Sequence, residues 1–166
     1  DGIYVDATFG RGGHARAILA RLGPRGRLVG VDRDPAAERV AHQIADPRFT
    51  FRRAWFSELP DELSALGIER VDGALLDLGV SSPQIDDPER GFSFQREGPL
   101  DMRMARSGRT AAELVNRSTE AELTEIFRQY GEEPEAKRVA RAIMREREER
   151  PIETTRVLAE IVRRAK

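Results

Sequence analysis

The chain contains no cysteine among its 166 residues. Disulfide bonds and thiolate metal sites are therefore excluded, and a reducing compartment such as the cytoplasm is expected. Enzymes that need a cysteine nucleophile are excluded for the same reason, because no thiolate is available to form the covalent intermediate.

Long apolar runs and a net positive charge are also missing. No stretch of about eighteen apolar residues is present, so we expect no membrane-spanning helix. The 28 Lys and Arg residues are balanced by 29 Asp and Glu residues, which gives a net charge of -1. An overall positive field of the kind that attracts nucleic acid is therefore absent, although a local patch of arginines could serve the same purpose.

The first half of the chain alternates apolar strands with amphipathic helices. Strands are predicted at 3–5, 28–31, 49–51 and 71–76, and helices at 14–22, 34–45 and 59–66. Continuous apolar strands alternating with helices indicate an α/β fold, with a doubly wound parallel sheet covered on both faces. Four strands make only a partial sheet of this kind. We therefore expect a fragment whose remaining strands follow Lys166.

The second half has a different pattern. Residues 79–108 are rich in Gly, Pro, Ser and Asp and are predicted to form one long loop. From Thr110 on the pattern is helical, with capping boxes at Thr110–Glu113 and Thr119–Glu122 and a later cap at Thr154–Thr155. The sequence thus predicts an α/β domain over 1–97 and a small, incomplete all-helical domain over 98–166.

A glycine-rich segment joins the first strand to the first helix. Residues 6–14 read DATFGRGGH. Gly10, Gly12 and Gly13 allow a tight turn and let the backbone approach a ligand closely. A plain structural turn, a dinucleotide-binding loop and an S-adenosylmethionine-binding loop all fit this segment.

Acidic residues follow three of the predicted strands. Asp6, Asp32 and Asp77 stand at strand ends, and the carboxyl ends of parallel strands face one crevice, where ligands of doubly wound sheets bind. Asp32 is placed to accept hydrogen bonds from a ribose, which both NAD and S-adenosylmethionine carry. Carboxylates suit a sulfonium cation better than a pyrophosphate. Asp6 can also be read as a local cap, and Ala15, at the third position of the dinucleotide fingerprint, keeps the NAD alternative open.

Residues beyond these strand ends are further candidates. Phe56 could stack on an adenine ring or pack into the core, whereas Trp55 is predicted to be a core residue. Gln84 could bind an adenine edge or a substrate base, or be an ordinary turn residue. His14 has no Cys or His cluster around it, so no metal site is expected.

The long loop and the last helices carry candidates for substrate binding. Aromatic residues interleaved with arginine suit an unstacked base and its phosphates, although a loop packed by its own side chains is the alternative. The candidate substrate-binding residues are Arg90, Phe92, Phe94 and Arg103. One helix face also presents Arg138, Arg141 and Arg145, which form either a phosphate track or, with nearby glutamates, a solvated face of ion pairs.

Several motifs together resemble one protein family. They are VDATFGRGGH at 5–14, DRDP at 32–35, LLDLGVSSPQ at 75–84, ERGFSF at 89–94 and GPLDMRM at 98–104, followed by YGEE at 130–133 and ARAI at 140–143. This set is similar to the bacterial small-subunit ribosomal RNA cytosine-N4 methyltransferases, the MraW or RsmH family. The resemblance covers nearly the whole chain.

The resemblance implies a class I methyltransferase fold, which is Rossmann-like, with a helical domain inserted after the fourth strand for substrate recognition. It implies S-adenosylmethionine as cofactor and methyl transfer to the N4 amine of a cytidine in the decoding centre, with ribosomal RNA and the small ribosomal subunit as partners and no metal or membrane. By position, the family's cofactor-binding residues map onto Gly12, Gly13, His14, Asp32, Phe56, Asp77 and Gln84. The residues themselves add Asp6 and Gly10 to this set.

A proton acceptor for the amine is the remaining requirement. Asp77 and Asp101 are the hypothesised catalytic residues, and Asp77 could instead only hold the cofactor. Two other classes of protein stay open: a nicotinamide-dependent oxidoreductase, and a non-catalytic fragment that binds cofactor or RNA.

Overall fold

In a computed structural model that describes residues 1–166, the chain forms two units, Asp1–Gly79 and Val80–Lys166. The first unit contains a four-stranded sheet with the order β3-β2-β1-β4. All neighbouring strands are parallel. The strands are β1 (Ile3–Asp6), β2 (Arg27–Asp32), β3 (Phe49–Arg53) and β4 (Gly73–Leu75).

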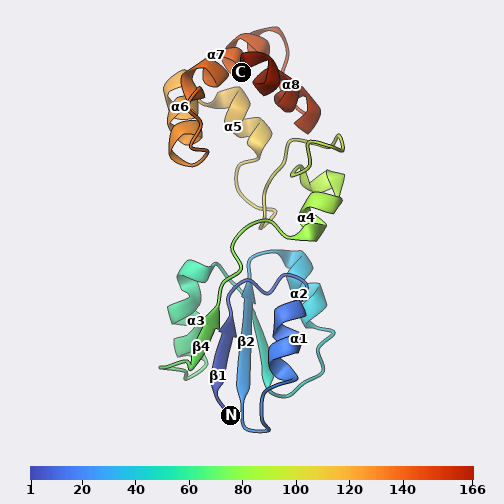
Figure 1. The fold of residues 1–166 in the computed structure, drawn as a ribbon, viewed down its shortest axis with the longest axis vertical. Helices are drawn as coiled ribbons and strands as arrows, with labels where there is room; N and C mark the ends of the chain where they lie inside the picture. Colours follow the sequence, from blue (N-terminus) through green and yellow to red (C-terminus); the bar gives the residue numbers. More distant parts are fainter. The chain divides into compact units, whose positions relative to one another are not determined.

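Helices cover both faces of this sheet (Figure 1). They are α1 (Gly13–Leu19), α2 (Pro35–Ala41) and α3 (Leu59–Ala65), with a 3-10 turn, η1 (Phe56–Glu58), before α3. Alternate residues of β2 point to opposite faces. Leu28 packs in one apolar cluster with residues of α1 and α2, while Val29 and Val31 pack in another with residues of α3. The predicted doubly wound α/β fold is thereby confirmed.

Local signals explain where the elements begin and end. Asp34 caps α2 by accepting a hydrogen bond from the Ala36 N–H at 2.8 Å, and Pro35 occupies the favourable first turn. The helices α1 and α2 end three to four residues earlier than the periodicity predicts. The strand β4 is also shorter than predicted, because pairing with β1 stops at Leu75.

The second unit is helical. It contains α4 (Ser82–Asp86), a 3-10 turn η2 (Pro88–Arg90), α5 (Ala111–Arg117), α6 (Glu120–Gln129), α7 (Ala136–Glu149) and α8 (Thr155–Ala165). Both predicted capping boxes are present, at Thr110 and Thr119, and Thr154 caps α8. The core of this unit is built from apolar residues of four helices and the loops, among them Leu100, Val115, Leu123, Ile143, Ile152 and Ile161.

Two predictions about the long loop differ from the structure. Residues 79–108 are not a single irregular loop, because α4 and η2 lie within them. The boundary between the units falls at Gly79–Val80 and not at 97–98. The reason is packing within the second unit, since the Arg90 carbonyl accepts from the Met102 N–H at 3.1 Å and the Arg90 guanidinium donates to carbonyl oxygens beyond position 98.

Candidate cofactor site and the loop after it

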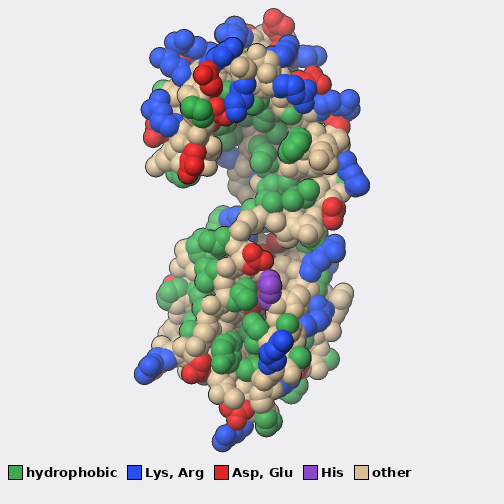
Figure 2. Space-filling view, viewed as in Figure 1, with side chains coloured by type: hydrophobic (Ala, Val, Ile, Leu, Met, Phe, Trp, Pro, Cys, Tyr) green, Lys and Arg blue, Asp and Glu red, His purple; other side chains and the backbone are tan.

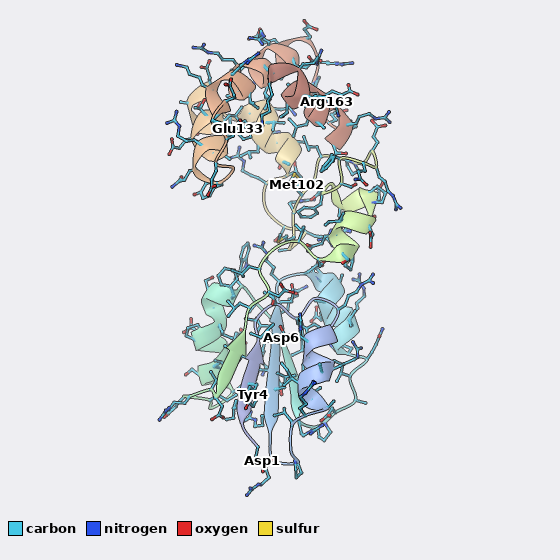
Figure 3. All side chains as sticks on the ribbon, in the orientation of Figure 1. Asp1, Tyr4, Asp6, Met102, Glu133 and Arg163 are labelled. Carbon is cyan, nitrogen blue, oxygen red and sulfur yellow. The ribbon has the colours of Figure 1, made fainter.

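Three carboxylates lie at the carboxyl ends of adjacent strands. Asp6 ends β1, Asp32 ends β2, and Asp77 follows β4 by two residues. Figure 3 shows Asp6 at the end of β1 opposite to Asp1. The pKa of Asp6 responds to the charges of Asp32, Asp77 and His14. The three acids therefore share one edge of the sheet, as the sequence predicts.

Asp6 is the most deeply placed of these acids. The residue is fully buried, and its Oδ1 accepts a hydrogen bond from the Thr8 N–H at 3.2 Å. Its Oδ2 is buried with no hydrogen-bond partner. Burial raises the pKa of Asp6, and the Thr8 N–H and His14 oppose that rise. A buried carboxylate oxygen without a donor is costly, so a bound group with N–H donors or a positive charge would satisfy it.

The glycine-rich loop is built around left-handed backbone. Gly10 and Gly12 have φ of 53° and 70°. A Cβ on Gly12 would also lie 2.7 Å from the Phe9 ring, so glycine is required there for two reasons. Gly13 has nothing within 4 Å of its Cβ position, which leaves open space beside the loop.

Asp32 is fixed by two peptide groups. Its Oδ2 accepts from the Gly10 N–H at 2.8 Å, and its Oδ1 accepts from the Asp34 N–H at 2.9 Å. A carboxylate has about four acceptor positions. The anchored side chain can therefore still accept hydrogen bonds from a pair of hydroxyl groups.

Asp77 and His14 form an exposed pair. The His14 Nε2 lies 3.3 Å from the Asp77 Oδ2, and both side chains are more than half exposed. The Asp77 N–H donates to the Thr8 hydroxyl oxygen at 2.8 Å. The peptide of Asp77 is thereby anchored while its carboxylate is open to solvent and ligands.

Two aromatic residues stand beyond the end of β3. Phe56 is 53% exposed, which suits a ring that stacks on a ligand. Trp55 is 47% exposed, so its assignment to the core is wrong. The Arg33 guanidinium lies over the Trp55 ring at 4.5 Å, and this cation–π contact takes the place of core packing.

Gln84 belongs to the second unit. The residue is buried in α4, and its Oε1 accepts from the Ser81 N–H at 2.9 Å. Its carbonyl oxygen thus completes the capping box at the start of α4. Gln84 therefore stabilises the first turn of α4, which is a more specific role than that of an ordinary turn residue.

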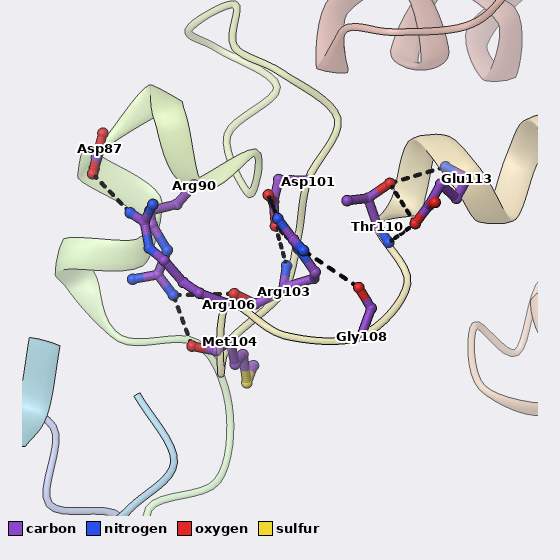
Figure 4. A network of polar contacts seen from close by, with 9 residues as sticks. All are labelled: Asp87, Arg90, Asp101, Arg103, Met104, Arg106, Gly108, Thr110 and Glu113. Atoms are coloured by element: carbon purple, nitrogen blue, oxygen red, sulfur yellow. Dashed lines mark hydrogen bonds and ion pairs between the residues drawn. The ribbon is translucent and has the colours of Figure 1, made fainter. Parts of the chain in front are cut away.

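The arginines of the loop are used within the loop itself (Figure 4). Arg90 is buried, and its guanidinium donates to the carbonyl oxygens of Arg103 at 3.3 Å and Met104 at 3.0 Å. Arg103 donates to both oxygens of Asp101 and to the Gly108 carbonyl. The packed-loop alternative therefore describes these arginines better than contact with substrate phosphates.

The other loop candidates differ from one another. Phe92 is half-buried, whereas Phe94 is 74% exposed. The turn that carries Phe94 is closed by the Ser93 hydroxyl, which accepts from the N–H groups of Gln95 and Arg96. Arg103 holds the pKa of Asp101 below its ordinary range, and both Asp101 oxygens accept from that guanidinium. Asp101 is accordingly a weak base in this arrangement.

The surface of the helical unit mixes both signs of charge, as Figure 2 shows. Arg138 pairs with Glu135 at 3.5 Å, and Arg141 pairs with Glu120 at 3.1 Å. These two arginines of the α7 face therefore belong to a solvated, ion-paired surface. No helix is long and apolar enough to cross a lipid bilayer, and no group of three or more His, Cys, Asp or Glu side chains is arranged to hold a metal.

Comparison with known proteins gives the chain its family. Residues 1–166 match the model of the MraW methylase family. The chain belongs to the MraW methylase family. It is 54% identical over 98% of its length to "Ribosomal RNA small subunit methyltransferase H" of Burkholderia vietnamiensis, covering 53% of that protein. It is 56% identical over 98% of its length to the protein of the same name of Thiobacillus denitrificans, covering 52% of it. The chain spans about half the length of these relatives.

Membership of the MraW methylase family matches the resemblance drawn from the motifs. One residue of the site escapes sequence reasoning, although it lies within the most conspicuous motif. Thr8 stands between Asp6 and Gly10, and its hydroxyl binds the peptide of a residue 69 positions away. No local pattern marks that contact, because it exists only when β1 and β4 are neighbours.

Proposed function

We propose that the complete protein is an S-adenosylmethionine-dependent methyltransferase that modifies the N4 amine of a cytidine in the decoding centre of small-subunit ribosomal RNA. The observation that carries the cofactor assignment is the free, buried Oδ2 of Asp6, flanked by Asp32 and Asp77 at one edge of the sheet. The cytoplasm, where ribosomal RNA is modified, is the expected compartment.

The charge of this edge favours a cationic ligand. S-adenosylmethionine carries a sulfonium and an ammonium group, and three carboxylates attract both. A dinucleotide would instead bring the two negative charges of a pyrophosphate toward Asp6, which already has a raised pKa because it is buried and near other acids. The nicotinamide-dependent alternative is disfavoured on this ground.

The nucleoside part of the cofactor has matching residues. Asp32, held by the N–H groups of Gly10 and Asp34, would accept hydrogen bonds from the ribose hydroxyls. The exposed ring of Phe56 would stack on the adenine. The open space beside Gly13 would let the backbone approach the methionine part closely.

The substrate assignment rests on the relatives and on the chemistry of the base. When bound, S-adenosylmethionine supplies an electrophilic methyl group whose departing sulfur takes the electron pair of the broken carbon–sulfur bond. An exocyclic amine is a weak nucleophile, so the protein must hold the nitrogen in line with the methyl carbon and accept the proton that the nitrogen loses. No thiolate is available in this chain for attack on the pyrimidine ring.

Asp77 is the better of the two proposed proton acceptors. Its side chain is exposed and its peptide is anchored to Thr8, whereas Asp101 is occupied by Arg103. We therefore expect Asp77→Asn to lower turnover at saturating cofactor. Asp101→Asn should leave the rate of the chemical step unchanged, provided that the variant loop folds as in the wild type. The two variants are compared in single-turnover methylation of small ribosomal subunits.

The proposed function is tested first by binding. Calorimetry with the complete protein should detect S-adenosylmethionine and not NAD. Binding of NAD alone would support the oxidoreductase, and cofactor binding without methylation of the small subunit would support a non-catalytic role. Transfer of the methyl group to a base other than cytidine, or to a position other than N4, would contradict the substrate assignment.

A further inference from the structure

Thr8 connects two of the three strand-end acids. The residue is half-buried in the loop between β1 and α1. Its N–H donates to the Asp6 Oδ1 at 3.2 Å, and its hydroxyl oxygen accepts from the Asp77 N–H at 2.8 Å. Thr8 therefore links the end of β1, through its backbone N–H, to the segment that follows β4, through its hydroxyl.

The Thr8 hydroxyl extends the pairing of β1 and β4 beyond the strands. The last paired residues are Asp6 and Leu75, and the Ala7 N–H still donates to the Leu75 carbonyl at 2.9 Å. After β4, the Asp77 N–H donates to the loop that follows β1, and its acceptor is the Thr8 hydroxyl oxygen. A peptide N–H that leaves a ladder needs another acceptor, and valine at position 8 would not supply one.

Asp77 depends on this anchor because little packing holds it. Its side chain is 73% exposed, and Leu76 and Leu78 on either side are 51% and 67% exposed. The contact with His14 joins two exposed side chains and contributes little rigidity. The hydrogen bond to Thr8 therefore has a large share in setting where the Asp77 backbone stands.

We propose that Thr8 is a positioning residue that holds the Asp6 carboxylate and the Asp77 backbone in one arrangement for the cofactor, an inference that rests on the proposed function. Thr8 uses its N–H and its hydroxyl lone pair toward the protein. The hydroxyl hydrogen remains as a further donor. In this proposal the effect of Thr8 on the ligand is transmitted through Asp77, so a methyl group in place of the hydroxyl should loosen Asp77, and the double-mutant cycle below separates this route from direct donation by the hydroxyl.

The test uses the complete protein and calorimetry with S-adenosylmethionine. Thr8→Val replaces the hydroxyl by a methyl group, and loss of one hydrogen bond should weaken binding between about 2- and 12-fold. Thr8→Ser keeps the hydroxyl and should bind within about twofold of the wild type, which is the rescue expected of a positioning role. Thr124→Val is the matched control, because the Thr124 hydroxyl donates to the Glu120 carbonyl within α6. It should leave the affinity unchanged.

A double-mutant cycle separates positioning from a general structural effect. If Thr8 acts through Asp77, Thr8→Val should weaken binding in the wild type and have no further effect in the Asp77→Asn background. Additive losses would overturn the proposal, as would unchanged affinity in Thr8→Val or a large loss in Thr8→Ser. Thr8→Ala serves the same cycle if the valine variant does not fold. A wild-type protein that binds no S-adenosylmethionine would refute the proposed function, which is a different outcome from any of these.

Discussion

The charge of Asp6 offers the sharpest test of the site, through the substitution Asp6→Asn. The carboxylate is fully buried, its Oδ1 accepts from the Thr8 N–H, and its Oδ2 has no partner. Asparagine has nearly the same shape and can keep the acceptor at Oδ1. The substitution removes the charge and replaces the free oxygen by an NH2 group, whose donors are also unpaired in the ligand-free protein. A buried charge costs more than a buried neutral amide, so we predict opposite effects on stability and on cofactor binding.

Stability of the ligand-free protein should rise or stay level in Asp6→Asn. Burial raises the pKa of Asp6 above 3.8, so the folded protein holds this proton more tightly than the unfolded chain. The contribution of Asp6 to the free energy of unfolding therefore falls as pH rises from about 3.8 through the raised pKa, and stays lower above it. Asparagine has no such loss. The variant should gain stability relative to the wild type between about pH 4 and pH 7, measured by urea denaturation.

Cofactor binding should change in the other direction. A hydrogen bond to a charged group contributes about 1.5–3 kcal/mol, which corresponds to roughly 10- to 160-fold in Kd. Calorimetry with S-adenosylmethionine measures this loss. Binding by Asp6→Asn within twofold of the wild type would show that the free oxygen does not meet the ligand, and the reasoning from charge would be refuted.

Asp46→Asn is the matched control for both measurements. Asp46 lies in the same unit, and its hydrogen bonds with Arg48 lower its pKa to about 2. Its contribution to stability is therefore present above about pH 3.8 and is lost as pH falls toward 2. The control should lose stability near neutral pH, with the opposite sign to Asp6→Asn, and should bind the cofactor normally.

Two further predictions concern the loop of the helical unit. Arg90→Met should lower the free energy of unfolding by about 1–3 kcal/mol, because it removes the hydrogen bonds from the guanidinium to the Arg103 and Met104 carbonyl oxygens, as measured by denaturation of the complete protein. An unchanged midpoint would contradict the structural role of Arg90. Phe94→Ala should leave stability within about 0.5 kcal/mol, because the ring is exposed, and should weaken RNA binding by about 1–3 kcal/mol if the ring stacks on a base. Equal RNA affinity in a filter-binding titration would remove Phe94 from the substrate site.

Much of the sheet unit could be predicted because its signals are local. Apolar strands ending in acids, a glycine-rich loop and the Asp34–Pro35 helix start each depend on neighbouring residues, and parallel pairing brings successive strand ends to one edge. The three acids were placed together on that ground. Trp55 shows the limit of such reasoning, because an aromatic residue next to a strand is buried only if another layer covers it, and here Arg33 lies over the ring instead.

The loop of the second unit was less predictable for a related reason. In the sequence, Arg90 and Arg103 among aromatic residues look the same whether their side chains bind RNA or their own loop. The choice depends on which carbonyls and carboxylates the folded loop brings within reach. The boundary between the units has the same origin, since Arg90 is joined to later residues only when the folded loop brings the peptides of 102–104 beside it.

The amino-acid sequence alone determined the alternation of strands and helices and the strand ends that carry Asp6, Asp32 and Asp77, because period, caps and glycine positions act over a few residues. It also indicated the family, through the resemblance of its motifs. Tertiary structure alone decided that the Asp6 Oδ2 is left without a partner, that Thr8 anchors Asp77, and that Arg90 is buried. Each of these depends on atoms of residues far apart in the chain, whose approach is set by packing and not by local pattern.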